Sequence, residues 1–344
     1  MKKIILVVSG VLVFVAGGLY IDHRMSMDSS LDVLKQSSTP QESSQPVGKV
    51  ALSDIGKAPE FAGISAWLNS APLTMASLKG KVVLVDFWTY SCINCIRTLP
   101  YVTKWYDTYK NQGLVVVGVH TPEFDFEKDT GNVQDAIKRF GIHYPVAQDN
   151  SYGTWNAYGN QYWPAEYLID QNGNIVYTHF GEGEYDHTEN AIRELLGMSA
   201  NVAPNNGVDL SGIESPEMYF GTNRLQYLAP QQSASAQTSY TFPANLNLNN
   251  FALQGDWKFS PQNIQLSDGS GSIELKFHAS KVHIVASSSI PAQLTITVDG
   301  KEQPSVTVQG SQLYTLFNSN SPADHVIEIK VNQSGFEAFT FTFS

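Results

Sequence analysis

Two contrasting patterns of hydrophobic and polar residues divide the chain. Up to about residue 198, short continuous apolar runs alternate with stretches in which apolar residues recur at helical spacing. From about residue 213, apolar and polar residues alternate one by one, and turn dipeptides follow these runs. The first pattern predicts an α/β sheet domain, and the second predicts antiparallel strands with one buried face.

Individual elements follow from these patterns. Strands are expected over residues 82–87, 114–119, 166–169 and 175–179, and helices over residues 95–110, 133–140 and 188–196. Further strands are expected around residues 273–277, 294–298 and 339–343, with turns at residues 268–269, 299–300 and 334–335. Trp257 shares strand parity with Phe251 and Leu253, so we expect it in the core. The C-terminal part is therefore predicted to be a jelly roll or β-sandwich.

The N-terminus carries an export pattern. Lys2 and Lys3 precede a nearly unbroken apolar run over residues 4–21, which as a helix at about 1.5 Å per residue approaches the roughly 30 Å of the bilayer core. We expect an N-terminal membrane anchor over residues 1–24, with a cleaved signal peptide as the alternative. The positive-inside rule then places the rest of the chain on the periplasmic side, anchored to the inner membrane by one helix.

Composition shifts give the remaining boundaries. A stretch rich in Ser, Gln and Pro predicts a flexible linker over residues 25–57, and residues 199–212 predict a second one. The α/β domain then covers residues 58–198 and the β-domain residues 213–344. With 42% hydrophobic residues the chain can form packed cores. Its net charge of −11 gives no basic field, so nucleic acid is not an expected partner.

The chain has two cysteines, Cys92 and Cys95, directly after the expected strand 82–87. A C-x-x-C that opens a helix stabilises the first thiolate through the helix N-terminus, so Cys92 is predicted to be the nucleophile. Cys95 is expected to be buried, to keep a nearly normal thiol pKa and to attack second. A structural disulfide is one alternative, although closing a loop of about four residues would contribute only about 2 kcal/mol. Half of a zinc site is the other, although the histidines lack ligand spacing.

The motifs around this pair resemble a thioredoxin-like protein of the redoxin, TlpA type, and most of all the thioredoxin-like plus β-sandwich C-terminal part of the DipZ family. An acid stands six residues before Cys92, a proline five residues after Cys95, and a Trp-Pro pair precedes the strand expected at residues 166–169. The residues that carry the resemblance are Asp86, Pro100, Trp163 and Pro164.

The resemblance implies roles for these positions. Asp86 would be a buried acid that accepts the Cys95 proton, and Pro164 a cis-proline beside the disulfide, supported by Trp163. Two supporting roles are left open: Trp88 as packing residue or lid, and Glu123 as a second acid. The acidic runs 123–129 and 182–186 are interpreted as solvated loops. No cofactor and no metal are implied.

The resemblance also implies a function: an extracytoplasmic thiol-disulfide oxidoreductase that reduces protein disulfides. In the DipZ family a multi-spanning electron-conducting domain precedes this part, and here one apolar segment stands in its place. Electrons are therefore expected from a separate membrane donor of the CcdA/DsbD type, as in cytochrome c biogenesis.

Two other classes remain as alternatives. A peroxiredoxin-like peroxidase is suggested by Thr89 three residues before Cys92, although Val85 stands where that class needs proline. A binding protein with an accessory redox domain would use its β-domain for carbohydrate or another partner, or would handle copper, although the C-x-x-C spacing does not suit copper.

Overall fold

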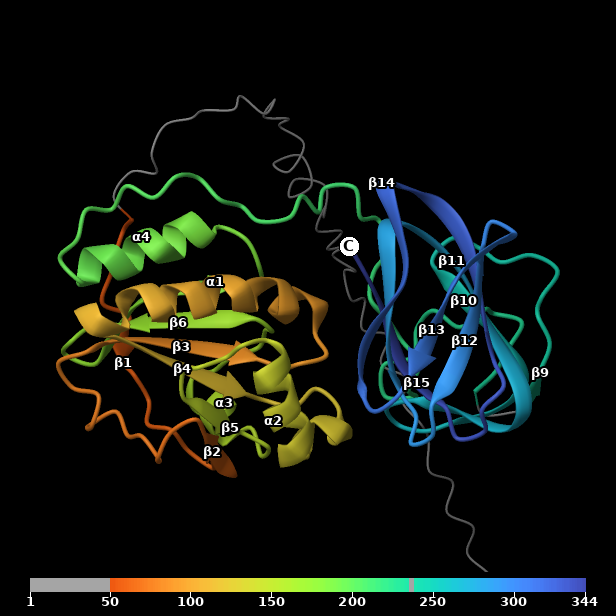
Figure 1. The fold of residues 1–344 in the computed structure, drawn as a ribbon, viewed down its shortest axis with the longest axis horizontal. Helices are drawn as coiled ribbons and strands as arrows, with labels where there is room; N and C mark the ends of the chain where they lie inside the picture. The colour runs from red at the N-terminus through yellow and green to blue at the C-terminus, as the bar shows by residue number, and fades with distance from the viewer. Residues whose placement is uncertain (1–49, 235–237) are drawn as a thin grey trace, which may run out of the picture. The chain divides into compact units, whose positions relative to one another are not determined.

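The computed structural model of the chain describes residues 50–234 and 238–344 (Figure 1). The predicted anchor and most of the first predicted linker lie outside these residues. Within the described part, no helix is both long and apolar enough to cross a membrane. Two sheets make up the structure, one in a mixed α/β domain and one in an all-β domain, as the sequence patterns predict.

The first sheet has seven strands in the order β1-β7-β6-β3-β4-β5-β2. At its centre, β3 (Val82–Trp88) runs parallel to β4 (Leu114–His120) and antiparallel to β6 (Ala165–Ile169). All residues of β3 are buried, which is why its sequence is apolar except for Asp86. The outer strands are β7 (Asn174–Phe180), β1 (Gly56–Lys57), β5 (Val146–Gln148) and β2 (Ala66–Leu68).

Helices cover both faces of this sheet. The long helices α1 (Ile93–Tyr109) and α4 (Tyr185–Leu195) lie along the same face (Figure 1). Their apolar residues share one core cluster with α2 (Thr130–Arg139), whereas α3 (Gly153–Ala157) contributes to the cluster on the other face. Two 3₁₀ segments complete the domain: η2 (Lys110–Gln112) and η3 (Asp125–Lys128).

The predicted strands and helices of this domain are confirmed, but four short elements were not predicted: β1, β2, β5 and α3. Each has two to five residues, too few to show a period. The prediction of a linker up to residue 57 is wrong at its end. The backbone N–H groups of Ser53 and Ile55 donate to carbonyls of β7, and β1 extends the sheet.

The second domain is all-β, as predicted. Its strands pair in the order β13-β12-β14-β11-β10-β9, and β15 pairs with β11 and β8. The strand bounds are β8 (Met218–Tyr219), β9 (Ser239–Tyr240), β10 (Asn250–Phe259), β11 (Ile264–Ser287), β12 (Ala292–Val298), β13 (Lys301–Val308), β14 (Gln312–Val331) and β15 (Glu337–Phe343). The long strand β11 changes partner along its length, from β10 in its first half to β15 in its second.

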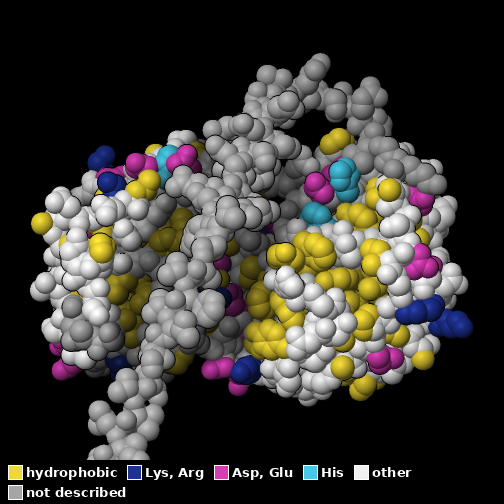
Figure 2. All heavy atoms as spheres, turned by 180° about the vertical axis from the view of Figure 1, so that it is seen from behind, with side chains coloured by type: hydrophobic (Ala, Val, Ile, Leu, Met, Phe, Trp, Pro, Cys, Tyr) yellow, Lys and Arg dark blue, Asp and Glu magenta, His cyan; other side chains and the backbone are white. Residues whose placement is uncertain are grey.

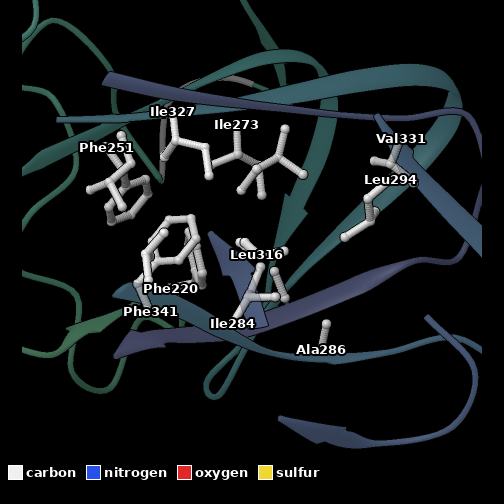
Figure 3. Packing of buried hydrophobic residues seen from close by; sticks show 14 of the residues in the cluster. Phe220, Phe251, Ile273, Ile284, Ala286, Leu294, Leu316, Ile327, Val331 and Phe341 are labelled. Carbon is white, nitrogen blue, oxygen red and sulfur yellow. The ribbon is translucent and has the colours of Figure 1, made fainter. Parts of the chain in front are cut away.

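The core of this domain is rich in aromatic and branched side chains. Phe220, Phe251 and Phe341 lie together at one end of it (Figure 3). Trp257 is fully buried in the same core, as its strand parity predicts. Stacked apolar side chains from several strands therefore hold the domain together.

One predicted turn is wrong and another is confirmed. Residues 268–269 do not end a strand, because β11 continues through them with a bulge, and Gly269 has a φ of 63° there. Asp299 and Gly300 form the two-residue hairpin between β12 and β13, with φ of 52° and 74°, which is the positive-φ pair that tight hairpins require.

Candidate active site

Cys92 and Cys95 lie where a buried strand becomes a helix. Cys92 is the N-cap of α1, and its Sγ accepts a hydrogen bond from the backbone N–H of Cys95 at 3.5 Å. Its side chain is half-buried, whereas that of Cys95 is fully buried. Cys92 is thus the more accessible thiol at the start of the helix, and Cys95 is buried, as the sequence predicts.

The prediction that Cys95 keeps a nearly normal pKa is wrong. Burial raises the pKa of the Cys95 thiol well above its usual value, and the neighbouring Cys92 and Asp86 raise it further. A buried thiolate is poorly solvated, and nearby negative charge destabilises it. Cys95 therefore needs a proton acceptor at the moment it attacks.

Asp86 is a buried acid whose charge acts on the Cys95 thiol. It lies in the middle of β3 with 1% of its surface exposed, on the face covered by α1. Neither of its carboxyl oxygens has a hydrogen-bond partner among the described residues. Burial raises its pKa to about 7, so the group exchanges protons in the neutral range, as a general base at this pH should.

Trp163 and Pro164 lie beside the first thiol. The peptide bond between them is cis, as the resemblance implies. The carbonyl oxygen of Trp163 is 4.0 Å from the Sγ of Cys92. The Trp163 indole donates to the carbonyl of Thr121 at 3.1 Å and packs on Trp155, with ring centroids 4.2 Å apart. The residue before the proline is thus fixed next to the reactive sulfur.

Trp88 is a packing residue and not a lid. Its side chain is fully buried in the core beneath α1, and its ring meets the His120 ring edge to face at 5.1 Å. His120 itself is fully buried, stacks on Tyr90 and has its pKa lowered to about 3 by burial. It is therefore a neutral core histidine at physiological pH.

Interpreting the acidic runs as solvated loops is wrong at several residues, above all at Glu127. This side chain is fully buried and accepts four hydrogen bonds. Two come from the N–H and hydroxyl of Ser91, at 3.3 and 2.6 Å, and two from the N–H groups of Glu123 and Phe124, at 2.5 and 3.0 Å. Because Ser91 precedes Cys92, these hydrogen bonds connect the loop before α1 to the loop that follows β4. No local sequence pattern distinguishes it from its exposed neighbour Asp125.

We expect a Glu127→Ala variant to lose about 3 kcal/mol of unfolding free energy, since three backbone N–H donors and a buried hydroxyl lose their partner. Urea unfolding at pH 7 measures this. Asp125→Ala is the matched control, because Asp125 pairs with Lys128 at an exposed site, where such a pair contributes at most about 0.5 kcal/mol. Equal effects of the two substitutions would contradict the structural role of Glu127.

The second acidic run also carries structural contacts. Glu182 forms a bidentate ion pair with Arg97 of α1, with N–O distances of 2.5 and 2.7 Å. Arg97 also donates a hydrogen bond to the side chain of Asn94, which lies between the cysteines. Asp186 is buried and accepts from the N–H of Asn205. The cation nearest the cysteine motif is thus neutralised by a carboxylate and is not free to stabilise a thiolate.

Glu123, predicted as a second acid, lies away from the thiols and contacts the β-domain. Both domains belong to one compact unit of the chain. Glu123 Oε1 accepts from Arg224 Nη1 at 2.7 Å and from the Tyr219 hydroxyl at 2.8 Å. All three line a pocket of about 270 Å³, together with Tyr152 and Trp163. Glu123 therefore shapes a surface next to Trp163 and has no direct contact with either cysteine.

Within residues 50–234 and 238–344, no three His, Cys, Asp or Glu side chains are arranged to hold a metal ion. On the face shown in Figure 2, Lys and Arg side chains are few and scattered. The site is thus a pair of cysteines with a buried acid.

Comparison with known proteins agrees with this site. Residues 55–196 match the family model described as Redoxin, and residues 215–344 match the one described as Thioredoxin like C-terminal domain. The thiol-disulfide oxidoreductase YkuV from Bacillus subtilis is 30% identical over 40% of this chain and 93% of its own length. Among solved structures, a putative thiol:disulfide interchange protein DsbE from Chlorobium tepidum is 28% identical over 42% of this chain and 99% of that one, with a TM-score of 0.38.

The similarity to YkuV places the chain in the family of thioredoxin-like thiol-disulfide oxidoreductases. Residues 55–196, which include both cysteines, carry the redoxin match. Protein DipZ from Mycobacterium tuberculosis is 38% identical over 86% of this chain, β-domain included. The chain spans 44% of the length of DipZ.

Proposed function

We propose that this protein is an exported, membrane-tethered reductant of protein disulfides. The observation that carries the proposal is the arrangement of the two thiols, with Cys92 accessible at the N-terminus of α1 and Cys95 buried near Asp86. This arrangement separates a thiol that attacks a client from a thiol that releases it.

The reaction proceeds in two exchanges. The Cys92 thiolate attacks one sulfur of the client disulfide, which forms a mixed disulfide and releases the other client sulfur as a thiolate that takes up a proton. Cys95 then gives its proton to Asp86 and attacks Cys92. The Cys92–Cys95 disulfide forms, the bond to the client breaks, and the second client thiol leaves. Two electrons have moved to the client, so an external donor must reduce the pair again.

The apolar run over residues 4–21 supports export and tethering, and a separate membrane donor of the CcdA/DsbD type fits a redox domain held at the membrane. Labelling intact cells with a membrane-impermeant thiol reagent tests this placement. We expect Cys92 to react without lysis and the protein to stay with the membrane fraction. Labelling only after lysis, or recovery in the soluble fraction, would contradict it.

The direction of electron flow is tested by the reduction potential. We expect a potential near about −270 mV, as in thioredoxin, and not near the about −120 mV of a strong oxidant. The buried Cys95 thiol has a raised pKa, and Arg97 is paired with Glu182, so the helix N-terminus is left as the main group that stabilises the Cys92 thiolate in the reduced state. Equilibration of the purified protein with glutathione measures the potential. A value near that of the strong oxidant would make the protein a disulfide donor.

A further inference from the structure

A row of ionisable side chains crosses the first sheet near Cys95. In the register of adjacent antiparallel strands, Asp86 on β3 lies opposite Glu166 on β6, and Glu166 lies opposite His179 on β7. Residues paired in this way point to the same face, with Cβ atoms about 4.5–5.5 Å apart. That face is the one beneath α1, because Leu168, two residues after Glu166, packs in the same core cluster as Cys95.

Glu166 is buried without an ion-pair partner. It has 1% of its surface exposed, and its Oε2 accepts a hydrogen bond from the hydroxyl of Thr188 on α4 at 2.9 Å. That hydroxyl lies 3.3 Å from the hydroxyl of Tyr177. Oε1 of Glu166 has no partner among the described residues, and neither do the two oxygens of Asp86. Unpaired carboxyl oxygens in a core are costly, and two facing carboxyls that share a proton remove much of that cost.

We propose that Glu166 is a positioning residue for the Cys95 proton: Asp86 and Glu166 together hold one proton beneath Cys95, and Thr188 fixes the orientation of the pair. The inference rests on the function proposed above. Protonated Glu166 donates to the Asp86 carboxylate and keeps it ready to accept. When Asp86 takes the proton of Cys95, both carboxyls are neutral, and one proton must leave before the next cycle.

Electrostatics supports the pairing. Burial raises the pKa of Asp86 to about 7, and burial together with the charge of Asp86 raises that of Glu166 to about 8. Two facing carboxylates in a buried site resist ionising together, so their protons leave in two separate steps. Besides Asp86, the titratable groups that face or approach Glu166 are Tyr144, Tyr177 and His179, and Cys95 interacts with Asp86. None of these is a cation that could neutralise both carboxylates, since burial lowers the pKa of His179.

The pH dependence of client release tests the proposal. Full-length protein in detergent is mixed with a disulfide-bonded peptide, and decay of the mixed disulfide is followed by stopped flow across pH. The wild-type rate should rise as the first proton leaves the pair. It should fall as the second leaves, because an added buried negative charge raises the Cys95 pKa further and leaves less of the attacking thiolate. In Glu166→Gln the rise should remain and the fall should disappear. A fall that persists at the same pH would overturn the proposal.

Two further variants sharpen the test. Glu189→Gln is the matched control, because Glu189 lies on α4 next to Thr188 but contacts Trp105 and Tyr109 instead of the row. In this variant the rate of client release should still rise and then fall with pH, as in the wild-type protein. Thr188→Val removes the hydrogen bond that favours the ionised Glu166, so the falling limb should move to higher pH. An unmoved limb would contradict the proposal even if Glu166→Gln fails to fold.

An infrared titration separates this inference from the proposed function. A chain with both Cys92→Ser and Cys95→Ser has no thiol chemistry but keeps the carboxyl pair. Asp86 and Glu166 should both ionise above pH 6 in this chain, besides Glu127 and Glu217, whose pKa values burial raises to about 7. Adding Glu166→Gln should remove one of these ionisations and move that of Asp86, whereas an Asp86 ionisation that stays at the same pH would overturn the pair. If the pair is present but the wild-type protein releases no client, the proposed function fails and the pair remains.

Discussion

A Cys95→Ser variant will accumulate mixed disulfides with client proteins, and a Cys92→Ser variant will accumulate none. Cys92 is half-buried at the helix N-terminus and can still attack, whereas the fully buried Cys95 is the thiol that would release the client. Both variants should lose all turnover of insulin-disulfide reduction, which makes this the largest effect that we expect from single substitutions.

Non-reducing gels of membrane extracts measure the trapping, and mass spectrometry of the trapped bands identifies the clients. The double variant Cys92→Ser with Cys95→Ser controls for association that does not involve a thiol. Equal trapping by the two single variants would mean that either sulfur can attack, and the assignment of Cys92 as nucleophile would then be wrong.

The cysteine site could be predicted because its parts are short motifs in fixed local geometry. A C-x-x-C that follows a buried strand dictates which thiol caps the helix and which is buried. The cis peptide at Pro164 and the buried acid Asp86 were implied by the resemblance, and the structure places both as implied. The roles of these residues can be predicted because each lies at a fixed distance in sequence from a cysteine or a strand.

The rest of the site depends on contacts between distant segments. Glu127 lies 36 residues from Ser91, and only the folded loops show that it binds there. Glu166 and Asp86 belong to strands that lie far apart in sequence, so their pairing follows from sheet register. The sequence predicts that Cys95 is buried, but the size of the rise in its pKa depends on how completely the fold excludes water and on the nearby Cys92 and Asp86. Sequence patterns predict elements well and the environment of a buried charge poorly.

We expect Asp86→Asn to make the protein more stable and a poorer catalyst. An unfolded aspartate ionises near its ordinary pKa of 3.8, but in the folded protein Asp86 ionises at about 7. The folded state therefore binds the extra proton between these values, and stability falls as pH rises through that window. At about 1.36 kcal/mol per pKa unit, the wild-type protein loses about 4 kcal/mol by pH 8, and Asp86→Asn avoids this loss.

Urea unfolding from pH 4 to pH 8 should show the two proteins equally stable at the acid end and Asp86→Asn more stable at the alkaline end. Asp149→Ala is the control, because the Asp149 carboxylate accepts a hydrogen bond from the N–H of Trp155 at 2.8 Å, and the loss of this acceptor should destabilise the protein at pH 8. Client release by Asp86→Asn should be at least about a hundredfold slower, the smallest usual contribution of a general base, while the attack of Cys92 keeps its rate. A gain in stability that is largest at acid pH would show that Asp86 is ionised in the folded protein. A slower first phase with normal release would mean that Asp86 acts on Cys92, and the proton route from Cys95 would have to be assigned to another group.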